Sequence, residues 1–369
     1  MTAFLCIEGK GHMQEFIKCL QAYLKGEKLN KIEYDKDLIN LAIEQSLQTI
    51  LYPVYNDKSY KKYYIGWVVK QEEFLSIQNE ITNIFNSNNI NHLYFKGSVL
   101  CNLYDDPSIR TRGDIDLYVS PNDLEKSKRL LLDSGYEYDD VDNMHHICFK
   151  KNNIEVEVHF SMVDDSWDKK IIKYLESPFS IATKQINNLY LLNPTEHFIY
   201  CMCHFAHHLR YGAGIRYILD FYYMLKKTDI DYEKLHKDLK ALELSKLYNN
   251  ILNVIYYLTN EKIDSFELID IDFFIQYMLK YGIHGHENDE VDMQSVAHKS
   301  KFKFLISRTF LTNKLYRQAK YPVLGKHWYL MPLCLLKHWW FLLTHKLGGF
   351  FKLVFKKNDR KELFNKLGI

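Results

Sequence analysis

Two short segments of this chain alternate acidic and aliphatic residues with the period of a β-strand. Residues 114–119 read Asp-Ile-Asp-Leu-Tyr-Val, and residues 154–160 read Ile-Glu-Val-Glu-Val-His-Phe. Successive side chains of a strand point to opposite faces of a sheet, so each segment presents its acids on one face and its aliphatic residues on the other. The fold must therefore include a sheet with one acidic face and one face buried in a core.

The residues before the first acidic segment predict a strand, a turn and a short helix. His92–Phe95 is a short apolar strand candidate. Gly97 allows a tight turn into a helix that runs from Ser98 to about Tyr104. Asp105–Ser108 contains a proline and ends that helix.

Turn and cap signals continue after the first acidic segment. Ser120-Pro121 predicts a helix start, with Ser120 as the N-cap, and Gly135 suits the C-terminal cap of that helix after Ser134. Asn152-Asn153 lies between two strand-like segments and predicts a β-hairpin. These elements together predict an α+β fold, with a mixed sheet flanked by helices.

Helical periodicity dominates the rest of the chain and suggests four regions. We expect a helical N-terminal region at residues 1–90, an α/β core at 91–192, a helical domain at 193–320 and an aromatic, basic C-terminal segment at 321–369. The helices expected beyond residue 190 include residues 194–209, 215–225 and 232–258.

Composition narrows the class of protein only broadly. The chain has 369 residues, 47% of them hydrophobic and 25% charged, and a net charge of +2. These values are ordinary for a soluble globular protein, and the small net charge argues neither for nor against nucleic acid. Seven cysteines without framework spacing read as reduced thiols, so we expect a cytoplasmic protein. We expect no secretory signal and no membrane span, because no apolar run of sufficient length occurs.

The acidic strand residues are suited to holding divalent cations. Asp114 and Asp116 stand at i and i+2 and present two carboxylates side by side. Hard cations such as Mg²⁺, or Mn²⁺ in its place, bind carboxylate oxygens and assist phosphoryl and nucleotidyl transfer. The second acidic strand offers a third acid, since Glu155, Glu157 and His159 share one face.

The turn before the first acidic strand offers groups that bind phosphate. Gly97 lets the backbone approach a ligand closely, and Ser98 at a helix start offers a hydroxyl and free N–H groups. Lys96, Arg110 and Arg112 lie nearby in sequence and carry the charge to neutralise phosphate. An isolated Asp-x-Asp is usually a solvated strand face, but strand, Gly-Ser turn, helix and two acidic strands in this order favour a catalytic site.

This ordered set of motifs resembles a bacterial family of uncharacterised nucleotidyltransferases within the DNA polymerase β-like superfamily. The resemblance rests on motifs between residues 90 and 225: Leu93-Tyr-Phe-Lys-Gly-Ser-Val-Leu100, Leu103-Tyr104, Arg110-x-Arg-Gly-Asp-Ile-Asp-Leu-Tyr-Val119, Leu131-Leu-x-x-Gly-Tyr136, Val156-Glu-Val-His-Phe160, His197-x7-Phe-Ala-His-His208 and Arg216-Tyr-Ile-Leu-Asp220. Phe160 replaces the family's usual Trp, and the gap from Ser98 to Asp114 is longer than in compact nucleotidyltransferases.

The resemblance implies a nucleotidyltransferase-type sheet joined to a helical domain, with the nucleotide between them. It implies Mg²⁺ held by Asp114, Asp116 and Glu157, with Gly97 and Ser98 at the phosphates. Glu157 is preferred to Glu155 because it directly precedes Val-His, as in the family's Glu-Leu-His pattern.

The expected helix at 194–209 carries cysteines and histidines that allow two interpretations. Cys201, Cys203, His204 and His208 could be read as a zinc site, but Cys-x-Cys on a helix points its thiols to different faces. We favour the interpretation that the cysteines are core residues and that His204 and His208, with Arg216 and Asp220, face the nucleotide or the acceptor.

The C-terminal segment mixes aromatic and basic residues and also has two interpretations. It contains Trp328, Trp339, Trp340, Phe341, Phe350 and Phe351, together with Lys326, Lys337, Lys346, Lys352 and Lys356. Such a segment suits a peripheral contact with an anionic membrane or an acceptor. Packing against the helical domain is the more common outcome, and we favour it.

Taken together, the sequence predicts an Mg²⁺-dependent nucleotidyltransferase. It would move a nucleoside monophosphate from a nucleoside triphosphate such as ATP to a hydroxyl of a sugar, protein or RNA acceptor. A toxin-type enzyme acting on tRNA ends is one alternative and would need a basic groove beside the site. A non-catalytic module that only binds nucleotide is the other.

Overall fold

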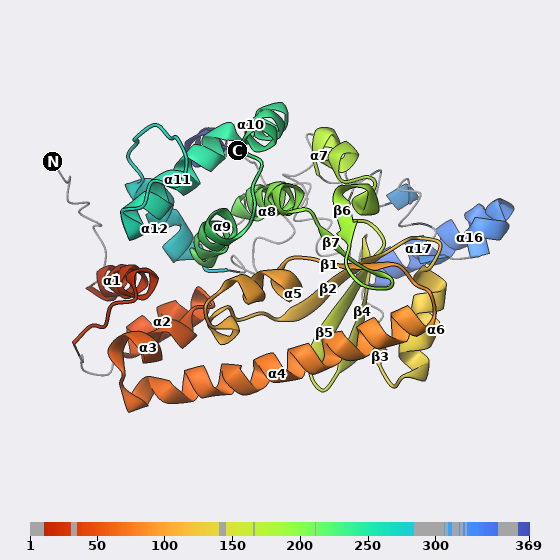
Figure 1. The fold of residues 1–369 in the computed structure, drawn as a ribbon. Coiled ribbons are helices and arrows are strands. Elements are labelled where there is room, and N and C mark those ends of the chain that lie inside the picture. The colour runs from red at the N-terminus through yellow and green to blue at the C-terminus, as the bar shows by residue number, and fades with distance from the viewer. Residues whose placement is uncertain are drawn as a thin grey trace.

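The computed structural model describes residues 11–30, 35–139, 145–164, 167–210, 212–283, 306, 309–311, 317, 320–321, 323–345 and 361–369. Helices form both ends of this chain and surround one sheet (Figure 1). The fold is α+β, as the sequence predicts. The elements of the N-terminal part are α1 (Gly11–Lys25), α2 (Lys36–Glu44), the 3₁₀ helix η1 (Gln48–Ile50), α3 (Leu51–Tyr55) and the long helix α4 (Lys58–Ser87).

A seven-stranded mixed sheet forms the centre, with strand order β3-β4-β5-β2-β1-β7-β6. Strand β2 lies antiparallel to β1 and parallel to β5, so the two acidic strands are direct neighbours. The strands are β1 (His92–Tyr94), β2 (Asp114–Val119), β3 (Glu137–Asp139), β4 (His146–Lys151), β5 (Ile154–His159), β6 (Ala182–Lys184) and β7 (Leu189–Leu192). The sequence did not predict β3, β6 and β7 as strands, because segments of three or four residues are too short to show a period.

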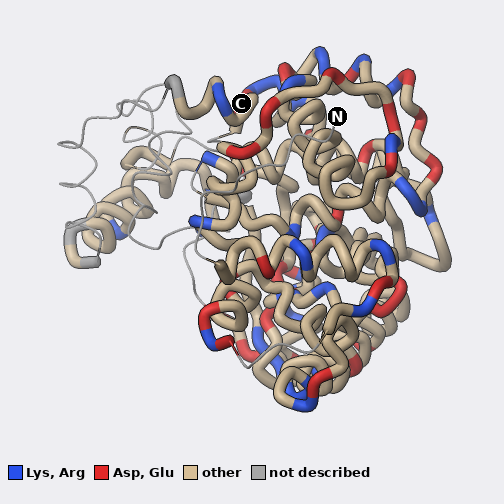
Figure 2. The backbone as a smooth tube through the Cα atoms, turned by 90° about the vertical axis from the view of Figure 1, so that its left-hand side faces the viewer, with Lys and Arg blue, Asp and Glu red and all other residues tan. Residues whose placement is uncertain are grey.

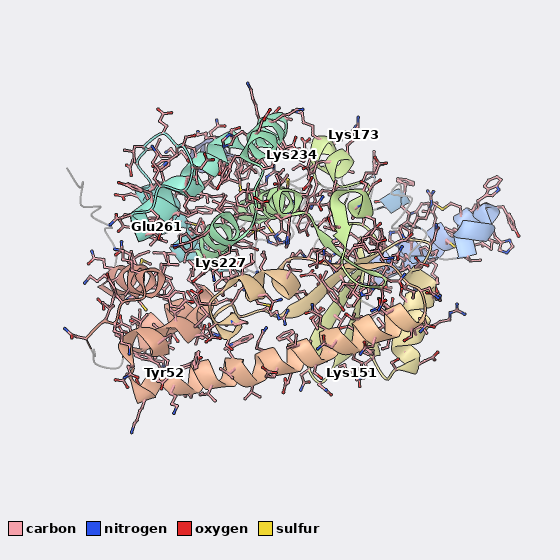
Figure 3. The ribbon with its side chains drawn as sticks, in the orientation of Figure 1. Tyr52, Lys151, Lys173, Lys227, Lys234 and Glu261 are labelled. Carbon is pink, nitrogen blue, oxygen red and sulfur yellow. The ribbon has the colours of Figure 1, made fainter. Side chains whose placement is uncertain are left out.

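The aliphatic face of the sheet is buried under two helices, α4 and α6 (Leu124–Asp133) (Figure 1). The sheet residues in this core include Ile115, Leu117, Val156 and Val158, and the helices add Phe74, Ile81 and Leu131. Lys151 at the end of β4 fastens the sheet to α4, since its Nζ donates to Glu80 at 2.5 Å (Figure 3). Burial of this face leaves the acids of β2 and β5 on the opposite face.

Helix α6 begins later than the sequence predicts. Its N-cap is Asp123 rather than Ser120. The Ser120 hydroxyl instead accepts the N–H of Asn122 at 3.3 Å, and the Ser120 carbonyl accepts the N–H of Asp123 at 2.8 Å. The Ser-Pro pair therefore makes a turn before the helix and does not cap it. Gly135 follows the helix with a φ of +79°, as the cap prediction requires.

The predicted hairpin is present between β4 and β5. Asn152 and Asn153 both have positive φ, at 51° and 60°, as the two central residues of a tight hairpin turn require. This turn fixes the antiparallel register in which His146 lies opposite His159 and Cys148 lies opposite Glu157. Four potential ligand residues thereby share one face of the sheet.

Helices follow the sheet in the chain and form the helical part of the fold. They are α7 (Lys169–Tyr174), α8 (Pro194–Leu209), α9 (Arg216–Lys227), α10 (Tyr232–Ala241), α11 (Ser245–Thr259) and α12 (Asp272–Tyr281). The short 3₁₀ helices are η2 (Cys101–Leu103), η3 (Pro107–Ile109) and η4 (Pro178–Ile181), and α5 (Gly97–Leu100) precedes η2. Tyr174 of α7 donates to Asp238 of α10 at 3.0 Å, and Lys173 and Lys234 mark these two helices in Figure 3.

The single helix predicted for residues 232–258 is wrong, because the structure divides it into α10 and α11. Glu243 between them has a φ of +63°, which a continuous helix does not allow. The N–H of Leu244 then returns to the Leu239 carbonyl at 2.8 Å and closes the first helix. The apolar periodicity continues through the break because both helices bury one face in the same core.

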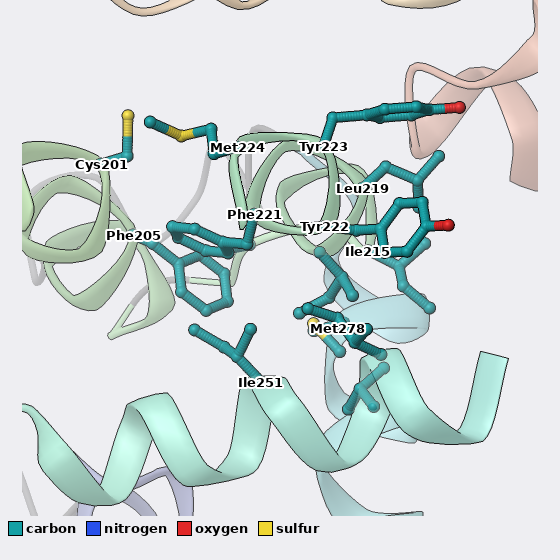
Figure 4. Close-up of a cluster of buried hydrophobic side chains, with 14 of the residues drawn as sticks. Cys201, Phe205, Ile215, Leu219, Phe221, Tyr222, Tyr223, Met224, Ile251 and Met278 are labelled. Atoms are coloured by element: carbon teal, nitrogen blue, oxygen red, sulfur yellow. The ribbon is translucent and has the colours of Figure 1, made fainter. Parts of the chain in front are cut away.

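The core of the helical part is rich in large aromatic and sulfur-containing side chains (Figure 4). Phe205 of α8 packs against Phe221 of α9 with ring centroids 5.6 Å apart, and Ile251 of α11 and Met278 of α12 lie beside them. The same buried cluster continues into α1, α2, Leu93 of β1, Phe95 just after β1, and Leu367 near the C-terminus. Core contacts thus join all four predicted regions, while the predicted region boundaries stay predictions.

The C-terminal segment includes α16 (Val323–Lys326), η6 (Trp328–Leu330), α17 (Met331–His345) and α19 (Lys361–Leu367). The Trp339 side chain is partly buried, and its indole N–H donates to the Thr309 carbonyl at 2.7 Å. Trp328 and Trp340 are instead 79% and 71% exposed. Membrane contact by this segment stays a prediction; Lys346, Phe350, Phe351, Lys352 and Lys356 lie outside the described residues. None of the described helices has the length and apolar character needed to cross a membrane.

Candidate active site

The pairing of β2 with β5 brings the predicted acids together. In this parallel register Asp116 lies opposite Glu157, and Asp114 lies opposite Glu155. All four side chains therefore belong to the face of the sheet opposite to the one that α4 and α6 cover. Glu157, chosen from the sequence as the third acid, is the direct neighbour of Asp116.

Asp116 is the most fully enclosed of these acids, with 1% of its surface exposed. Its Oδ1 accepts a hydrogen bond from Lys96 Nζ at 2.7 Å and lies 3.0 Å from His159 Nε2. Its backbone N–H donates to the hydroxyl of Ser98 at 3.1 Å. Asp116 thus holds both the glycine turn and β5 in place around itself.

Glu157 shares His159 with Asp116 and adds a second imidazole. His159 Nε2 lies 3.1 Å from Glu157 Oε2, and His146 Nε2 lies 3.3 Å from Glu157 Oε1. One ligand atom each from Asp116, Glu157 and His159 lie within 4.8 Å of one another, which suits a single metal ion. Among the described residues, Asp114 belongs to no such group and stands beside it on β2.

The electrostatics of the cluster show an unbalanced negative charge. Burial, together with Asp116 and Glu157, raises the pKa of Asp114 to about 7. Burial works against ionisation of Asp116 too, but Lys96 and the His159 hydrogen bond hold its pKa below the ordinary value. Burial likewise opposes ionisation of Glu157, yet the His159 hydrogen bond lowers the pKa of that carboxyl to about 2. One lysine and one histidine therefore satisfy two acids, and for Asp114 the effects of Lys96 and Arg216 do not outweigh burial and the two neighbouring acids.

The turn between β1 and α5 is tight and partly strained. Lys96 has a φ of +49°, an uncommon conformation for a residue with a side chain. A side chain at Gly97 would place its Cβ 2.8 Å from Arg110 Nη1, so glycine is needed there for space. The Ser98 hydroxyl, predicted to face phosphate, is buried and accepts the Asp116 N–H. Phosphate contact by Gly97 and Ser98 stays a prediction.

The predicted phosphate arginines are held inside the protein. Arg110 makes a two-bond ion pair with Asp220 of α9, at 2.7 Å and 2.9 Å, and Tyr104 also donates to Asp220 at 2.8 Å. Arg112 donates to the Gly97 carbonyl at 3.3 Å and lies over the Phe74 ring, 4.4 Å from its centroid. Both Asp220 oxygens are engaged, so this residue joins α9 to the segment between α5 and β2. Its predicted ligand contact stays untested.

Helix α8 directs aromatic and imidazole groups toward the carboxylates. The Tyr200 ring contacts Phe95 beside Lys96, with centroids 5.3 Å apart. His204 and His208 approach each other with Nε2 atoms 3.1 Å apart, and the His204 ring lies near Tyr200. Cys201 and Cys203 are buried core residues, as preferred from the sequence, and within the described chain neither joins a metal-binding group.

Comparison with known proteins identifies the family of this chain. The family model described as "Uncharacterised nucleotidyltransferase" matches residues 37–260, from α2 to the end of α11. The chain belongs to this nucleotidyltransferase family. No curated protein matches it, and no solved structure does.

Family membership confirms the resemblance read from the motifs and extends it. The match includes the N-terminal helices α2–α4 and the helices α10 and α11, which carry none of the motifs quoted for the resemblance. Membership of this family implies a nucleotide substrate, and nucleotidyltransferases generally use divalent metal ions.

Two histidines beside this candidate site were not predicted as site residues. His145 directly precedes β4, and His146 is its first residue. The centroids of both rings lie within 5.2 Å of the His159 ring centroid. In the sequence, His145-His146 at the start of a strand predicts only one residue inward and one outward. The hairpin register that places His146 opposite His159 was the available signal, since it follows from the Asn-Asn turn.

Proposed function

We propose that this nucleotidyltransferase moves a nucleoside monophosphate from a nucleoside triphosphate to a hydroxyl group of an acceptor, with Mg²⁺, or Mn²⁺ in its place, as cofactor. The observation that carries the proposal is the β2–β5 register, which sets Asp116 and Glu157 side by side with His159 between them. We assign the metal to Asp114, Asp116 and Glu157.

The chemistry of the donor set fits a divalent cation. The site offers carboxylate oxygens from two strands, the ligand type that Mg²⁺ prefers. The pKa of Asp114, raised to about 7 by burial and its two acidic neighbours, indicates a place where positive charge is lacking. A dication beside these three carboxylates would supply that charge. When bound, it would neutralise charge that develops on the α-phosphate and activate the attacking hydroxyl.

In this proposal Lys96 pairs either with Asp116 or with the triphosphate. Its Nζ donates to Asp116 Oδ1, and burial, which alone would lower its pKa, is outweighed by Asp116, so the pKa lies well above the ordinary value. The ammonium therefore stays charged. We propose that it turns from Asp116 to the triphosphate when metal and nucleotide enter, which keeps its charge compensated in both states.

Helices α8 and α9 bound the nucleotide side of the proposed site. Arg216 donates to the Thr111 carbonyl at 2.6 Å and acts electrostatically on Asp114. Burial lowers the pKa of His204 well below its ordinary value, so the ring is neutral and able to accept or donate one hydrogen bond. We assign His159, His204 and His208 to contacts that position the nucleotide or the acceptor, with Gly97, Ser98 and Arg112 behind the phosphates.

Transfer of radiolabel from the α-phosphate tests the proposal. Wild-type protein with Mg²⁺ and labelled ATP, GTP, CTP or UTP is expected to label a sugar, protein or RNA acceptor, or to release pyrophosphate. Asp116→Asn should lower that rate by about a thousandfold while the circular dichroism spectrum stays unchanged. Tight binding of Mg·NTP with no label transfer and no pyrophosphate release would instead favour the non-catalytic module.

The tRNA alternative receives no specific support. Figure 2 shows lysine and arginine positions interspersed with aspartate and glutamate along the backbone. A groove that binds RNA would instead need clustered basic residues. Labelling of tRNA in preference to sugar and protein acceptors in the same assay would bring that alternative back.

A further inference from the structure

Three imidazoles gather at one end of the carboxylate cluster. The His145 and His146 rings are 4.6 Å apart, and His159 lies 5.2 Å and 4.8 Å from them, centroid to centroid. One ring nitrogen from each lies within 4.8 Å of the others. All three residues come from the β4–β5 hairpin, whose register fixes their separation.

The distances between these nitrogens match those between ligands on one metal ion. His145 Nε2 and His146 Nδ1 are 3.3 Å apart. Two nitrogens at roughly 2.0–2.1 Å from a tetrahedral ion lie roughly 3.3–3.4 Å from each other. The pair therefore needs little movement to hold an ion.

A second observation points to a ligand at the same place. His159 is 1% exposed, and its Nδ1 has no hydrogen-bond partner among the described residues, while its Nε2 serves Asp116 and Glu157. Buried polar atoms without partners are costly, and a bound ion removes such a cost.

We propose that His145, His146 and His159 form a second metal site, which takes a borderline divalent transition-metal ion such as Zn²⁺. Imidazole nitrogens suit such ions, whereas Mg²⁺ prefers oxygen. Glu157, 3.3 Å from His146 Nε2, stands at the edge of this site and links it to the proposed Mg²⁺ site. This inference goes beyond the proposed function and shares only Glu157 and His159 with it.

Co²⁺ is a suitable probe because its visible absorption reports ligand type and geometry. The full chain, freed of metal by a chelator, is expected to bind one equivalent of Co²⁺ with the spectrum of a tetrahedral nitrogen-ligated ion. Zn²⁺ should displace it and excess Mg²⁺ should not. His145→Ala and His146→Ala should each weaken Co²⁺ binding at least about tenfold, as loss of groups around a metal commonly does.

Two control variants separate this site from other possibilities. His236 lies on α10 with a side chain 46% exposed, so His236→Ala removes an imidazole and should bind Co²⁺ like the wild type. Asp114 belongs to none of the described ligand groups, so Asp114→Asn should abolish Mg²⁺-dependent transfer and keep the cobalt spectrum. Absence of nucleotidyl transfer would not change the expected Co²⁺ binding, and absence of Co²⁺ binding would not contradict the proposed nucleotidyl transfer.

Two outcomes overturn the inference, and both can be read from well-folded protein. The first is a wild-type chain that binds no stoichiometric Co²⁺, or histidine variants that bind it as tightly as the wild type. The second is a thiolate-to-cobalt charge-transfer band, which would assign the ion to Cys148 with His146 and Glu157, the alternative group on these strands. Circular dichroism of each variant, with His145→Asn as a milder change, separates lost ligation from lost folding.

Discussion

At the scale of single residues, Asp116 and Asp220 have opposite tasks although both are buried aspartates. Asp116 faces a lysine and a histidine, and in the proposed function Lys96 exchanges Asp116 for the triphosphate. Asp220 is fixed by Arg110 and Tyr104, with 2% of its surface exposed. We assign the first residue to the proposed chemistry, whereas the second joins α9 to the segment before β2.

The raised pKa of Asp114 predicts that Mg²⁺ binding depends on pH. A carboxyl with a pKa of about 7 carries a proton below pH 7 and must release it to bind the ion. We expect the Mg²⁺ affinity to fall by roughly tenfold per pH unit below 7 and to be level above it. Protonated His159, whose pKa is raised by Asp116 and Glu157 against the effect of burial, acts in the same direction.

Calorimetric titrations with Mg²⁺ at several pH values between 5.5 and 8 measure this dependence. In Asp114→Asn the affinity should be weak and should change less with pH. Equal wild-type affinities at pH 6 and pH 8 would contradict the assignment of Asp114 to the metal.

Removal of the Asp220 carboxylate should destabilise the protein strongly. Asp220→Ala leaves Arg110 buried without its partner, which is expected to cost about 3–5 kcal/mol. The Lys226–Glu261 pair is a matched control, with side chains 45% and 44% exposed, and Glu261→Gln should cost about 0–1 kcal/mol. Urea denaturation gives both free energies of unfolding. Similar losses in the two variants would argue against a structural link at Asp220 between α9 and the segment before β2.

At the scale of elements, the site depends on two turns that hold strands in register. The turn at Lys96–Ser98 fastens β1 and α5 to β2 through the Ser98 hydroxyl. The turn at Asn152-Asn153 fixes β4 against β5. A slip of one residue in either pairing would turn the acids or the histidines to the wrong face of the sheet.

Gly97 and Gly113 form a matched pair that tests the first turn. Gly97→Ala would push a Cβ to 2.8 Å from Arg110 Nη1, and the same guanidinium is held by Asp220 through Nε and Nη2, whereas a Cβ at Gly113 meets nothing within 4 Å. We expect Gly97→Ala to lower stability by about 1–3 kcal/mol, as overpacking does. Gly113→Ala should leave the melting temperature close to that of the wild type. Thermal melting of both variants measures the difference. A lower melting temperature for Gly113→Ala than for Gly97→Ala would show that space around Gly97 is not limiting.

Sequence patterns predicted the elements that carry chemistry better than those that surround it. Strand β2 and helix α8 have the predicted bounds, since period-2 alternation and a proline at the first helical position are strong local signals. The engagement of Ser98 with Asp116 and of Arg110 with Asp220 could not be predicted. Both contacts join residues far apart in the sequence, and local pattern carries no information about such pairs.

At the scale of the whole molecule, helices from both ends of the chain meet around the site-bearing sheet. The last helix, α19, packs on α11: Asn250 donates to the Leu367 carbonyl at 3.2 Å, and Leu367 is fully buried. The C-terminal residues thus complete the core of the helical part that bounds the site.

A cavity at Leu367 should therefore reduce stability much more than a change on α17. Leu367→Ala is expected to cost about 2–5 kcal/mol because it leaves a buried cavity. Leu333 on α17 is 64% exposed, and Leu333→Ala should stay within about 0.5 kcal/mol of the wild type. Chemical denaturation compares the two, and equal effects would show that α19 is not part of the stable core.

The central claim, that Asp116 and Glu157 together bind a metal–nucleotide complex, is tested most directly by calorimetric titration of Mg·NTP into Glu157→Gln and Glu155→Gln. The two glutamates share one strand and one face, and only Glu157 lies opposite Asp116. We predict that Glu155→Gln binds as the wild type does and that Glu157→Gln binds at least about tenfold more weakly. Unchanged binding by Glu157→Gln, or a loss confined to Glu155→Gln, would contradict the account.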